Sequence, residues 1–590
     1  MNRLRRVLPA VGWVSDYDLR DARGDLSAGL TVGVMLIPQG MAYAVLAGMP
    51  PIYGLYAALL PPLVYPLFGS SRHLAVGAVA VDMIIIAAGA GAVAGPGSPE
   101  YVGAAVLLAV LVGVTELAMG LARMGFLANL LSRPVIAGFT AAAALIILFS
   151  QVGNLIGVEI ARTQFVHDVA IEAAGRIGEA SLPSVAIGAG GILTLVGLRK
   201  WNEVFPAELV VIVAATALAW SLDLGAEGVM LVGEVPSGLP SVDLPPLTPE
   251  NLAAMWPTVV TLAMVQFMSV VSVGRVVSAR YRYTIDPNRE LLGIGAANVV
   301  GGLFQSIPAS GSFSRTAVNE QAGARTPAAN GVAAVLVGLS LLFLTPLFRY
   351  LPMPALAAII MVAAVGLVDV REVRRLFAIQ PSDGWVALLT FVCTLLVGIQ
   401  EGLLIGITAA VIVILYRISR PNVAELGHLP ATRSFRNIEN FEEADPIPGI
   451  LVLRVEAGFS FFNASFFKDY ILGKSRSERR IRAVIIDGLS INFLDSTAVD
   501  ELQEVVGTLR EWGIEIHFTG LTGPVRDVVD RSGLGKFVGA DNFHISPHYA
   551  VVDLLDRWDQ DDRGHRLEHY WRRTQQQEEE VEPTSEEEFI

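Results

Sequence analysis

Residues 308–316, which read Pro-Ala-Ser-Gly-Ser-Phe-Ser-Arg-Thr, interrupt a long apolar part of the chain. They follow a Gly/Ala-rich span that ends in Leu-Phe-Gln-Ser at 303–306, and the pattern predicts an extended piece followed by a short helix. An earlier stretch is similar: Leu-Phe-Gly-Ser at 67–70 precedes Arg-His-Leu-Ala-Val-Gly-Ala-Val-Ala at 72–80. Interrupted apolar segments at corresponding places in two halves of a chain indicate the central site of a transporter. We therefore expect the two breaks to meet inside a membrane domain.

The composition around these breaks is that of a membrane protein. Of the 590 residues, 53% are hydrophobic and 17% are charged, whereas soluble chains carry about 25% charged residues. Apolar runs of membrane-spanning length recur between residues 26 and 416, and roughly ten to twelve crossings are expected from hydropathy. After Arg417 the density of charge rises sharply. The sequence therefore predicts a membrane part followed by a soluble part.

The distribution of Lys and Arg predicts the orientation in the membrane. The loop 223–251 holds five acids and no base. Basic residues gather in other loops and next to the first and last spans, so we expect both termini in the cytoplasm and the protein in the inner membrane. The N-terminus does not have the pattern of a cleaved signal peptide. The Glu-rich residues 563–590 are expected to be a disordered acidic tail.

Several classes of function are disfavoured by what the sequence lacks. Its single cysteine, Cys393, lies in an apolar run, so no disulfide framework or zinc cluster is expected within one chain. It shows no phosphate-binding loop, no nucleophile–base set and no basic patch for nucleic acid. We therefore expect no enzyme, no cofactor, no metal site and no nucleic-acid partner.

The two breaks have the chemistry of an anion site. A helix that begins inside the membrane leaves its first N–H groups without partners, and these groups, with the positive end of the helix dipole, favour a negative ligand. Small residues let an ion approach the backbone, hydroxyls add donors and an arginine adds positive charge: Gly77, Gly311, Ser312, Ser314 and Arg315. The alternative is that Gly and Ser only allow helices to pack closely.

Two acids at membrane depth are candidates for proton coupling. Asp82 is expected about one turn into the helix after the first break, and an ionisable residue at that depth is a functional hypothesis by default. Its protonation would reduce the repulsion of an incoming anion. The alternatives are a structural hydrogen bond to a neighbouring helix or a charge partnership with Arg315. Glu116 is the second candidate, and it could instead pair with Arg123.

Five motifs resemble the signature of one family. They are residues 36–44 (LIPQGMAYA), 48–56 (GMPPIYGLY), 70–77 (SSRHLAVG), 131–135 (LSRPV) and 311–319 (GSFSRTAVN). Their sequences and order resemble those of the sulfate permease (SulP/SLC26) anion transporters, and the resemblance covers about residues 10–560. It implies fourteen membrane segments in two inverted repeats of seven, a core and a gate domain, a homodimer, and an elevator-like movement of core against gate.

The resemblance also implies roles for individual residues. The anion would lie between the third and tenth segments, at Gly77, Ala78 and Val79 and at Ser312, Phe313, Ser314 and Arg315, with Gln39 and Tyr43 of the first segment beside it. Two departures stand out. Relatives commonly read Val-Gly-Pro where this chain has Val-Gly-Ala at 76–78. Many cation-coupled relatives carry an acid on the eighth segment, where this chain has Ser269, so a cation site of the usual kind is not expected there.

The C-terminal part has the alternating pattern of an α/β domain. Strands are predicted at 450–455, 484–486 and 514–518, and a helix over 496–512. Asp-Gly-Leu-Ser at 487–490 with Phe-Leu-Asp-Ser-Thr-Ala at 493–498 resembles the signature loop of STAS domains. In STAS switches a hydroxyl here is phosphorylated, so Ser496 and Thr497 are regulatory candidates, although the favoured interpretation is that one of them caps the helix. His517 is expected to be structural.

The sequence thus predicts an α-helical polytopic membrane protein followed by an α/β STAS domain. The expected parts are a cytoplasmic segment (1–24), a transmembrane domain (25–418), a linker (419–448), a STAS domain (449–562) and the acidic tail. The first hypothesis for function is secondary active transport of a small inorganic anion, with sulfate taken up together with a proton or sodium ion. Bicarbonate or chloride transport, including exchange, is the alternative. A hypothesis from another class is a membrane-anchored STAS signalling protein that senses an anion.

Overall fold

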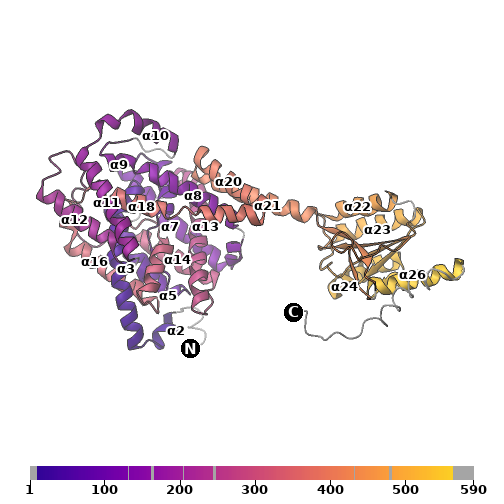
Figure 1. Ribbon diagram of the computed structural model, residues 1–590. Coiled ribbons are helices and arrows are strands. Elements are labelled where there is room, and N and C mark those ends of the chain that lie inside the picture. The colour runs from indigo at the N-terminus through magenta and orange to yellow at the C-terminus, as the bar shows by residue number, and fades with distance from the viewer. Residues whose placement is uncertain are drawn as a thin grey trace. The chain divides into compact units, whose positions relative to one another are not determined.

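The computed structural model describes residues 10–129, 132–160, 165–202, 205–243, 248–430, 432–477 and 481–562. The chain divides between residues 410 and 411 into two units. The first is a helical bundle and the second is a sheet flanked by helices (Figure 1). The predicted acidic tail, the first nine residues of the predicted N-terminal segment and Leu131 of the fourth family motif lie outside the described residues.

The first unit is built from helices and two very short strands. The strands are β1 (Val76–Gly77) and β2 (Ser310–Gly311). The helices are α2 (Ala10–Ser15), α3 (Leu19–Leu46), α4 (Pro51–Ala57), α5 (Leu60–Phe68), α6 (Ala80–Gly91), α7 (Pro99–Leu121), α8 (Arg133–Ser150), α9 (Val152–Ile156), α10 (Val166–Gly175), α11 (Leu182–Trp201), α12 (Ala207–Ser221), α13 (Pro249–Arg280), α14 (Pro287–Leu303), α15 (Phe313–Gln321), α16 (Ala328–Phe343), α17 (Thr345–Phe348), α18 (Met353–Val365), α19 (Val370–Ile379), α20 (Pro381–Leu396) and α21 (Ile399–Ser419).

Many of these helices are long and apolar enough to cross a bilayer. Among the described residues there are eight such stretches, and α6, α12, α16 and α20 are shorter apolar helices. Large apolar side chains on several of them are exposed, such as Leu193, Phe343 and Ile412. Exposed apolar surface of this extent is stable in lipid rather than in water. The chain is a multi-pass membrane protein, and the number fourteen stays a prediction because length and composition alone identify these eight.

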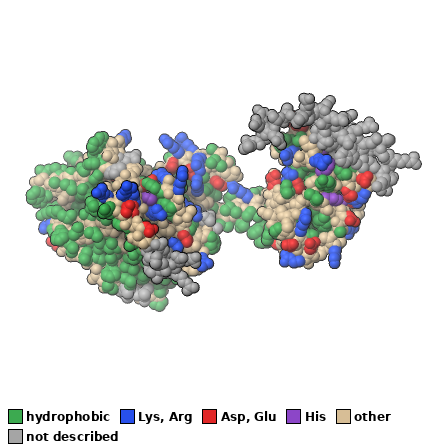
Figure 2. Space-filling model, turned by 90° about the horizontal axis from the view of Figure 1, so that it is seen from below, with side chains coloured by type: hydrophobic (Ala, Val, Ile, Leu, Met, Phe, Trp, Pro, Cys, Tyr) green, Lys and Arg blue, Asp and Glu red, His purple; other side chains and the backbone are tan. Residues whose placement is uncertain are grey.

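One face of the first unit carries a concentration of charged side chains. Figure 2 shows Lys and Arg side chains near the middle of this face, which is the one on which α2 lies, and hydrophobic side chains around its flanks. An embedded protein with an aqueous basic face shows this separation.

Glycines bring several helices of the bundle into close contact. A Cβ atom at Gly113 of α7 would lie 2.6 Å from the carbonyl oxygen of Gly295 of α14. Likewise, a Cβ atom at Gly54 of α4 would overlap the carbonyl group of Gly40 of α3. Small residues at such crossings let backbones approach, and packing of this kind stabilises helix pairs in lipid.

Two buried carboxylates fasten the loops next to the short strands. Glu290 of α14 accepts hydrogen bonds from the hydroxyl of Tyr65 at 2.6 Å and from the backbone N–H of Ser70 at 2.8 Å. Asp25 of α3 accepts the backbone N–H of Thr326 at 3.0 Å. The first contact holds the segment that leads into β1, and the second holds the segment that follows α15. The positions of both breaks are therefore fixed by side chains from other helices.

The second unit contains a six-stranded mixed sheet of order β4-β3-β5-β6-β7-β8. Strand β3 is antiparallel to β4 and β5, and the pairs from β5 to β8 are parallel. The strands are β3 (Val423–His428), β4 (Phe435–Asn437), β5 (Ile450–Val455), β6 (Ala483–Asp487), β7 (Glu515–Thr519) and β8 (Phe543–His544). The helices are α22 (Ala464–Ser477), α23 (Ser496–Glu511), α24 (Gly523–Ser532), α25 (Leu534–Val538) and α26 (Pro547–Asp562).

Helices cover both faces of this sheet. Side chains of α22 and α23, including Phe467 and Val505, form one core with the sheet, whereas Leu554 and Trp558 of α26 form a second core. Figure 1 shows α26 on the side opposite to α22 and α23. The central strands β5 and β6 are buried on both faces, which explains their nearly continuous apolar runs.

The predicted strands and helix of this unit are confirmed, with shifts of one or two residues. The predicted linker 419–448 differs from the structure. It contains β3 and β4, and β3 pairs with β5 through Val423 and Val455. The sheet therefore begins earlier than expected. The sequence did not indicate β3 because this strand ends at a Gly-His pair and lacks the continuous apolar run of its neighbour β5.

We predict that Gly54→Ala destabilises the first unit by at least 2 kcal/mol, because an added methyl group cannot be accommodated where two backbones touch. The measurement is the thermal unfolding temperature of the full chain in detergent. Gly190→Ala is the matched control, since a Cβ atom on that exposed helical glycine would meet nothing within 4 Å. An equal effect of both substitutions would contradict the close crossing of α3 and α4.

Candidate anion-binding site

The two breaks meet, as the sequence predicts. Strands β1 and β2 pair antiparallel, with Val76 opposite Gly311 and Gly77 opposite Ser310. The backbone N–H of Ser312 extends the pairing by donating to the carbonyl of Ala75 at 3.2 Å. A helix begins directly after each strand, α6 at Ala80 and α15 at Phe313. The pairing therefore brings two helix N-termini together.

These helix starts have few internal partners for their first N–H groups. Val79, the residue before α6, makes no side-chain capping bond. Ser312, the residue before α15, accepts the N–H of Arg315 through its hydroxyl at 3.5 Å, which is a long hydrogen bond. Phe313 and Ser314 are exposed, whereas Gly77 and Ala78 are buried. The start of α15 is thus the accessible side of the paired strands.

Arg315 is buried beside β1 with an incompletely bonded guanidinium. The residue is 1% exposed, and its Nη1 donates to Oε1 of Gln39 at 3.4 Å. Its Nε and Nη2 atoms have no hydrogen-bond partner among the described residues. A Cβ atom at Gly77, whose φ is 155°, would lie 3.4 Å from Nη2 and 2.8 Å from the side chain of Leu36. Glycine at this position lets the guanidinium lie directly against the backbone of the break.

Gln39 and Tyr43 lie one helical turn apart on α3, and both are buried. Gln39 also donates from Nε2 to Oε1 of Glu208 at 3.3 Å, and Glu208 of α12 pairs with Arg199 of α11. Sequence reasoning missed Glu208 and Arg199. Glu208 begins an apolar helix and is 1% exposed, so the rule that identified Asp82 as a membrane acid applies to it as well.

The two candidate acids are each bonded to a neutral amide. Gln266 of α13 donates to Oδ2 of Asp82 at 3.0 Å. Asn298 of α14 donates to Oε2 of Glu116 at 3.1 Å, so the expected alternative of a Glu116–Arg123 pair is wrong. Asp82 and Arg315 form no direct ion pair in the described part of the chain, although each acts electrostatically on the other. Of the two alternatives for Asp82, the hydrogen bond to a neighbouring helix is observed.

Ser269 is half-buried on α13, about one turn beyond Gln266. This is where cation-coupled relatives are expected to have an acid. The buried polar side chain of α13 in this region is the neutral Gln266, which contacts the acid of α6. Asp82, on the expected third segment, thus contacts Gln266 on the expected eighth segment, and α13 carries no acid in the turn around Ser269.

Comparison with known proteins decides the family. The model of the sulfate permease family matches residues 22–390, and that of the STAS domain matches residues 443–551. This chain belongs to the sulfate permease family. The family assignment and the predicted fold class, a helical membrane domain followed by a STAS domain, are confirmed.

Relatives of this family member cover nearly its whole length. It is 35% identical to sulfate transporter 4.1, chloroplastic, of Arabidopsis thaliana over 93% of its own length and 82% of the plant protein. It is 32% identical to a probable sulfate transporter of Mycobacterium tuberculosis (strain ATCC 25618 / H37Rv), over 92% and 97% of the two chains. The solved structure of SLC26A9 shares its fold with a TM-score of 0.88 at 22% identity, over 95% of this chain and 94% of that one. The transmembrane domain of a cyanobacterium bicarbonate transporter, BicA, matches with a TM-score of 0.59 at 22% identity, over 67% and 98%.

In the STAS domain of this family member, the start of α23 is capped by Asp495. Its carboxylate accepts the N–H of Ala498 at 2.9 Å and that of Phe461 at 2.8 Å. The interpretation that Ser496 or Thr497 caps this helix is therefore wrong. Both are exposed, because a carboxylate one residue earlier already satisfies the first turn. Their hydroxyls remain free of the cap, and phosphorylation there stays a proposal.

The STAS domain also contains a histidine cluster and a separate pocket. Nδ1 of His517 lies 3.0 Å from Nε2 of His544, and ligand atoms of these residues and Asp553 lie within 4.8 Å of one another. Arg557 pairs with Asp553 at 3.0 Å and with Glu515 at 3.0 Å. A guanidinium thus supplies the positive charge at this place, so we assign no metal to the cluster.

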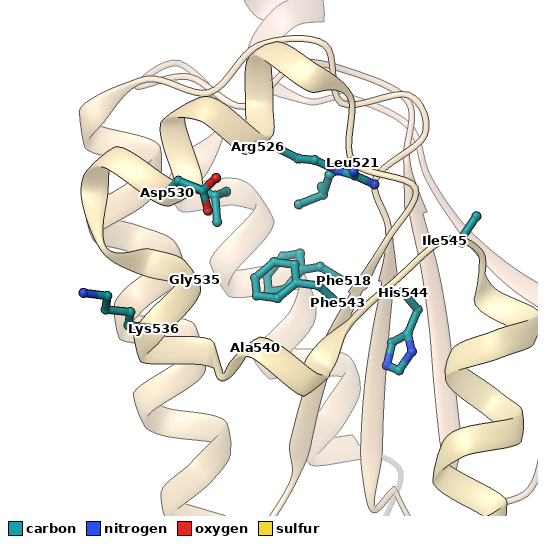
Figure 3. Close-up of a pocket in the computed structure, with 11 residues that line it drawn as sticks. Phe518, Leu521, Arg526, Asp530, Gly535, Lys536, Ala540, Phe543, His544 and Ile545 are labelled. Carbon is teal, nitrogen blue, oxygen red and sulfur yellow. The ribbon is translucent and has the colours of Figure 1, made fainter.

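The pocket has a volume of about 630 Å³. In Figure 3 the rings of Phe518 and Phe543, which stack at 5.8 Å, lie at its centre, with Arg526, Asp530 and Lys536 around it. It lies apart from the start of α23, since neither hydroxyl candidate lines it.

We predict that the STAS domain loses stability as the pH falls from about 6.5 toward 4. Burial, with the nearby charges of His544 and Arg557, lowers the pKa of His517 from 6.5 to about 4. The unfolded chain therefore binds a proton that the folded domain excludes, and the loss is roughly 2 kcal/mol at pH 5. Hydrogen exchange of β7 amides in the full chain, corrected for the intrinsic pH effect, measures this loss. His517→Gln should reduce the pH dependence, and an unchanged dependence would reject His517 as its source.

Proposed function

We propose that this chain is a secondary active transporter of small inorganic anions, with sulfate as the main substrate. One observation carries the proposal: Arg315 is buried at the joined helix starts with two guanidinium nitrogens that no described residue bonds. Leaving a buried charged donor unbonded costs several kcal/mol. An anion that enters the site would remove this cost. The names of the relatives, sulfate transporters of a plant and of a bacterium, support sulfate.

The geometry suits an oxyanion in particular. A guanidinium presents several N–H donors in one plane, which matches two oxygens of a tetrahedral anion. The first N–H groups of α6 and α15 and the hydroxyls of Ser312 and Ser314 supply further donors without further charge. Gln39 accepts a hydrogen bond from the guanidinium through its carboxamide oxygen. In this proposal Tyr43, Gly77, Ala78, Val79 and Phe313 form the rest of the lining.

Coupling to protons is proposed through Asp82. It lies in the first turn of α6, at the same helix start that faces the anion. An ionised Asp82 would repel a divalent anion and would partly neutralise the field of Arg315. Protonation removes both effects, so an anion and a proton would enter together. Glu116 is the second proposed member of the coupling machinery. Sodium stays the alternative coupling ion, although Ser269 offers no carboxylate for it.

A second candidate function is bicarbonate or chloride movement, including exchange. It is favoured by Ser269, because many cation-coupled family members carry an acid at this position and this chain does not. A third candidate, a membrane-anchored STAS protein that signals in response to an anion, predicts binding without flux. Uptake measurements separate all three.

The remaining expectations form part of the same proposal. We propose fourteen crossings in two inverted repeats, with the antiparallel pairing of β1 and β2 as its support, and an elevator-like movement of a core against a gate in a homodimer. We place the protein in the inner membrane with both termini in the cytoplasm. The proposed boundaries are 1–24, 25–418 and 449–562, with β3 and β4 of the segment 419–448 added to the STAS domain. Phosphorylation at Ser496 or Thr497 would place a charge at the start of α23.

The deciding experiment is uptake into proteoliposomes that contain the full chain. Radiolabelled sulfate and bicarbonate are compared with and without imposed proton and sodium gradients. Sulfate uptake that an inward proton gradient accelerates supports symport. Counter-transport of chloride or bicarbonate without such acceleration supports exchange, and binding without flux supports the signalling candidate.

We predict that Arg315→Ala lowers sulfate uptake at least 100-fold, since it removes the charge-assisted bonds to the anion. Arg315→Lys should restore only part of the uptake, because an ammonium keeps the charge and loses the planar donors. The exposed Arg349, which contacts Tyr350, provides the control Arg349→Ala. Normal uptake by Arg315→Ala would contradict the placement of the site.

We predict that Asp82→Asn removes the dependence of uptake on a pH gradient, because an amide cannot release a proton. The measurement is the ratio of initial sulfate uptake rates with external pH 5.5 and 7.5 at constant internal pH. The substitution keeps the size of the side chain and its contact with Gln266. An unchanged ratio would reject Asp82 as the proton carrier.

A further inference from the structure

Four buried polar side chains join the two candidate acids into one cluster. They come from four helices: Asp82 of α6, Gln266 of α13, Asn298 of α14 and Glu116 of α7, and none is more than 1% exposed. Asn298 donates to Oε1 of Gln266 at 2.9 Å, and this bond completes a chain of contacts from Asp82 to Glu116. Buried amides are tolerated in an apolar core when they are hydrogen-bonded, and these two amides are bonded to each other and to the two carboxyls.

A backbone N–H group sets the direction of this chain. The N–H of Ala309 donates to Oδ1 of Asn298 at 2.8 Å. Because a backbone N–H can only donate, the carboxamide oxygen of Asn298 must point toward it, and its NH2 group must point toward Gln266 and Glu116. The oxygen of Gln266 then accepts from Asn298, which leaves the Gln266 NH2 group facing Asp82. Both amides thus present donors to the acids, and Ala309 fixes this polarity.

The bonding leaves each acid half-satisfied. Oδ1 of Asp82 and Oε1 of Glu116 have no hydrogen-bond partner among the described residues, although both are buried. The charged groups that act on the cluster are few: Arg315 acts on Asp82, and Asp82 acts on Glu116. Glu290, a buried acid of α14 outside the cluster, accepts hydrogen bonds from Tyr65 and Ser70. Two ionised carboxylates without a bonded cation would repel each other in this medium, and one added proton relieves that repulsion.

Two members of the cluster, Asp82 and Asn298, connect it to the two breaks of the anion site. Asp82 lies in the first turn of α6, directly after β1, and Ala309 directly precedes β2. A change in the bonding of the cluster therefore acts on both partners of the β1–β2 pair. Asp82 contacts Gln266 of α13, and Arg315 lies against Gly77 of the same break.

We propose that Asp82, Gln266, Asn298 and Glu116 form a single proton-holding unit in which the two carboxyls share one transported proton, with Gln266 and Asn298 as the positioning residues that link its charge to the anion site. This inference rests on the proposed proton-coupled transport. Under this proposal two neutral residues, Gln266 and Asn298, set the pH at which the proton is taken up. Gln266 lies about one turn from Ser269. Each amide stabilises the ionised form of the carboxyl to which it donates.

The test is the pH profile of sulfate uptake by the full chain in proteoliposomes. Gln266→Met keeps the volume of the side chain and removes the donor to Asp82. Asn298→Asp keeps an oxygen for the N–H of Ala309 and replaces the donor to Glu116 by a further carboxyl. Gln266→Met should shift the midpoint of the profile upward by about one pH unit, the effect of losing one hydrogen bond to a charged group. Asn298→Asp should shift it upward by more, because the new carboxylate also repels Glu116. Gln400→Met is the matched control, since Gln400 contacts the same helix through Thr258, outside the cluster.

The outcomes separate this inference from the proposed function. If the unsubstituted chain transports sulfate and Asp82→Asn removes the pH dependence, the midpoint shifts in Gln266→Met and Asn298→Asp support the shared unit. A lower rate with an unmoved midpoint in both variants would show a structural role only and would overturn the inference, while symport through Asp82 would stand. In Glu116→Gln the midpoint of the pH profile should fall, because Asp82 no longer faces a second carboxylate that repels its charge. An unchanged midpoint there would also overturn the shared unit.

Discussion

The structure of the membrane unit depends on the pairing of two extended segments, β1 and β2. They lie inside an apolar bundle, where unpaired backbone would have to be helical. Extended backbone inside an apolar bundle must find partners for its N–H and C=O groups. Strands β1 and β2 satisfy each other, and neighbouring side chains satisfy the remainder: Asn330 of α16 accepts the N–H of Val76 at 3.2 Å and donates to the carbonyl of Leu74 at 2.7 Å. Because the pairing uses the strand groups, the first N–H groups of α6 and α15 stay available for a ligand. Breaking two helices thus creates a polar site inside the bundle.

Two polar networks leave this pairing in different directions. One carries positive charge and runs from Arg315 through Gln39 to Glu208. The other is uncharged in its middle and runs from Asp82 through Gln266. Both networks begin at residues of the helix starts. The first reaches the carboxylate of Glu208, and the second reaches that of Glu116. A change of charge at the break therefore acts on both networks, which would give the proposed binding of an anion and of a proton a common structural element.

How well each structural feature could be predicted depends on how local its sequence signal is. The breaks, the strand Ile450–Val455 and the helix from Ser496 have strong local patterns, and the structure contains them. Gln266 and Asn298 were not predicted, because a neutral amide in an apolar span has no charge to mark it and its meaning depends on partners far along the chain. Strand β3 was placed in a linker for a related reason, since its role as a partner of β5 is a long-range pairing.

The site residues also explain why sequence predicts the anion class better than the anion. Backbone N–H groups, hydroxyls and one guanidinium recognise negative charge and oxygen atoms, which sulfate and bicarbonate share. Such donors discriminate between these two anions through the free energy of removing each ion from water and through the space beside Gly77. A sequence motif encodes neither quantity. In the proposed proton symport, coupling adds a second selection. A co-transported proton offsets one negative charge, so its benefit is larger for a divalent anion than for a monovalent one. The residues proposed to hold the proton would therefore contribute to substrate choice without touching the anion.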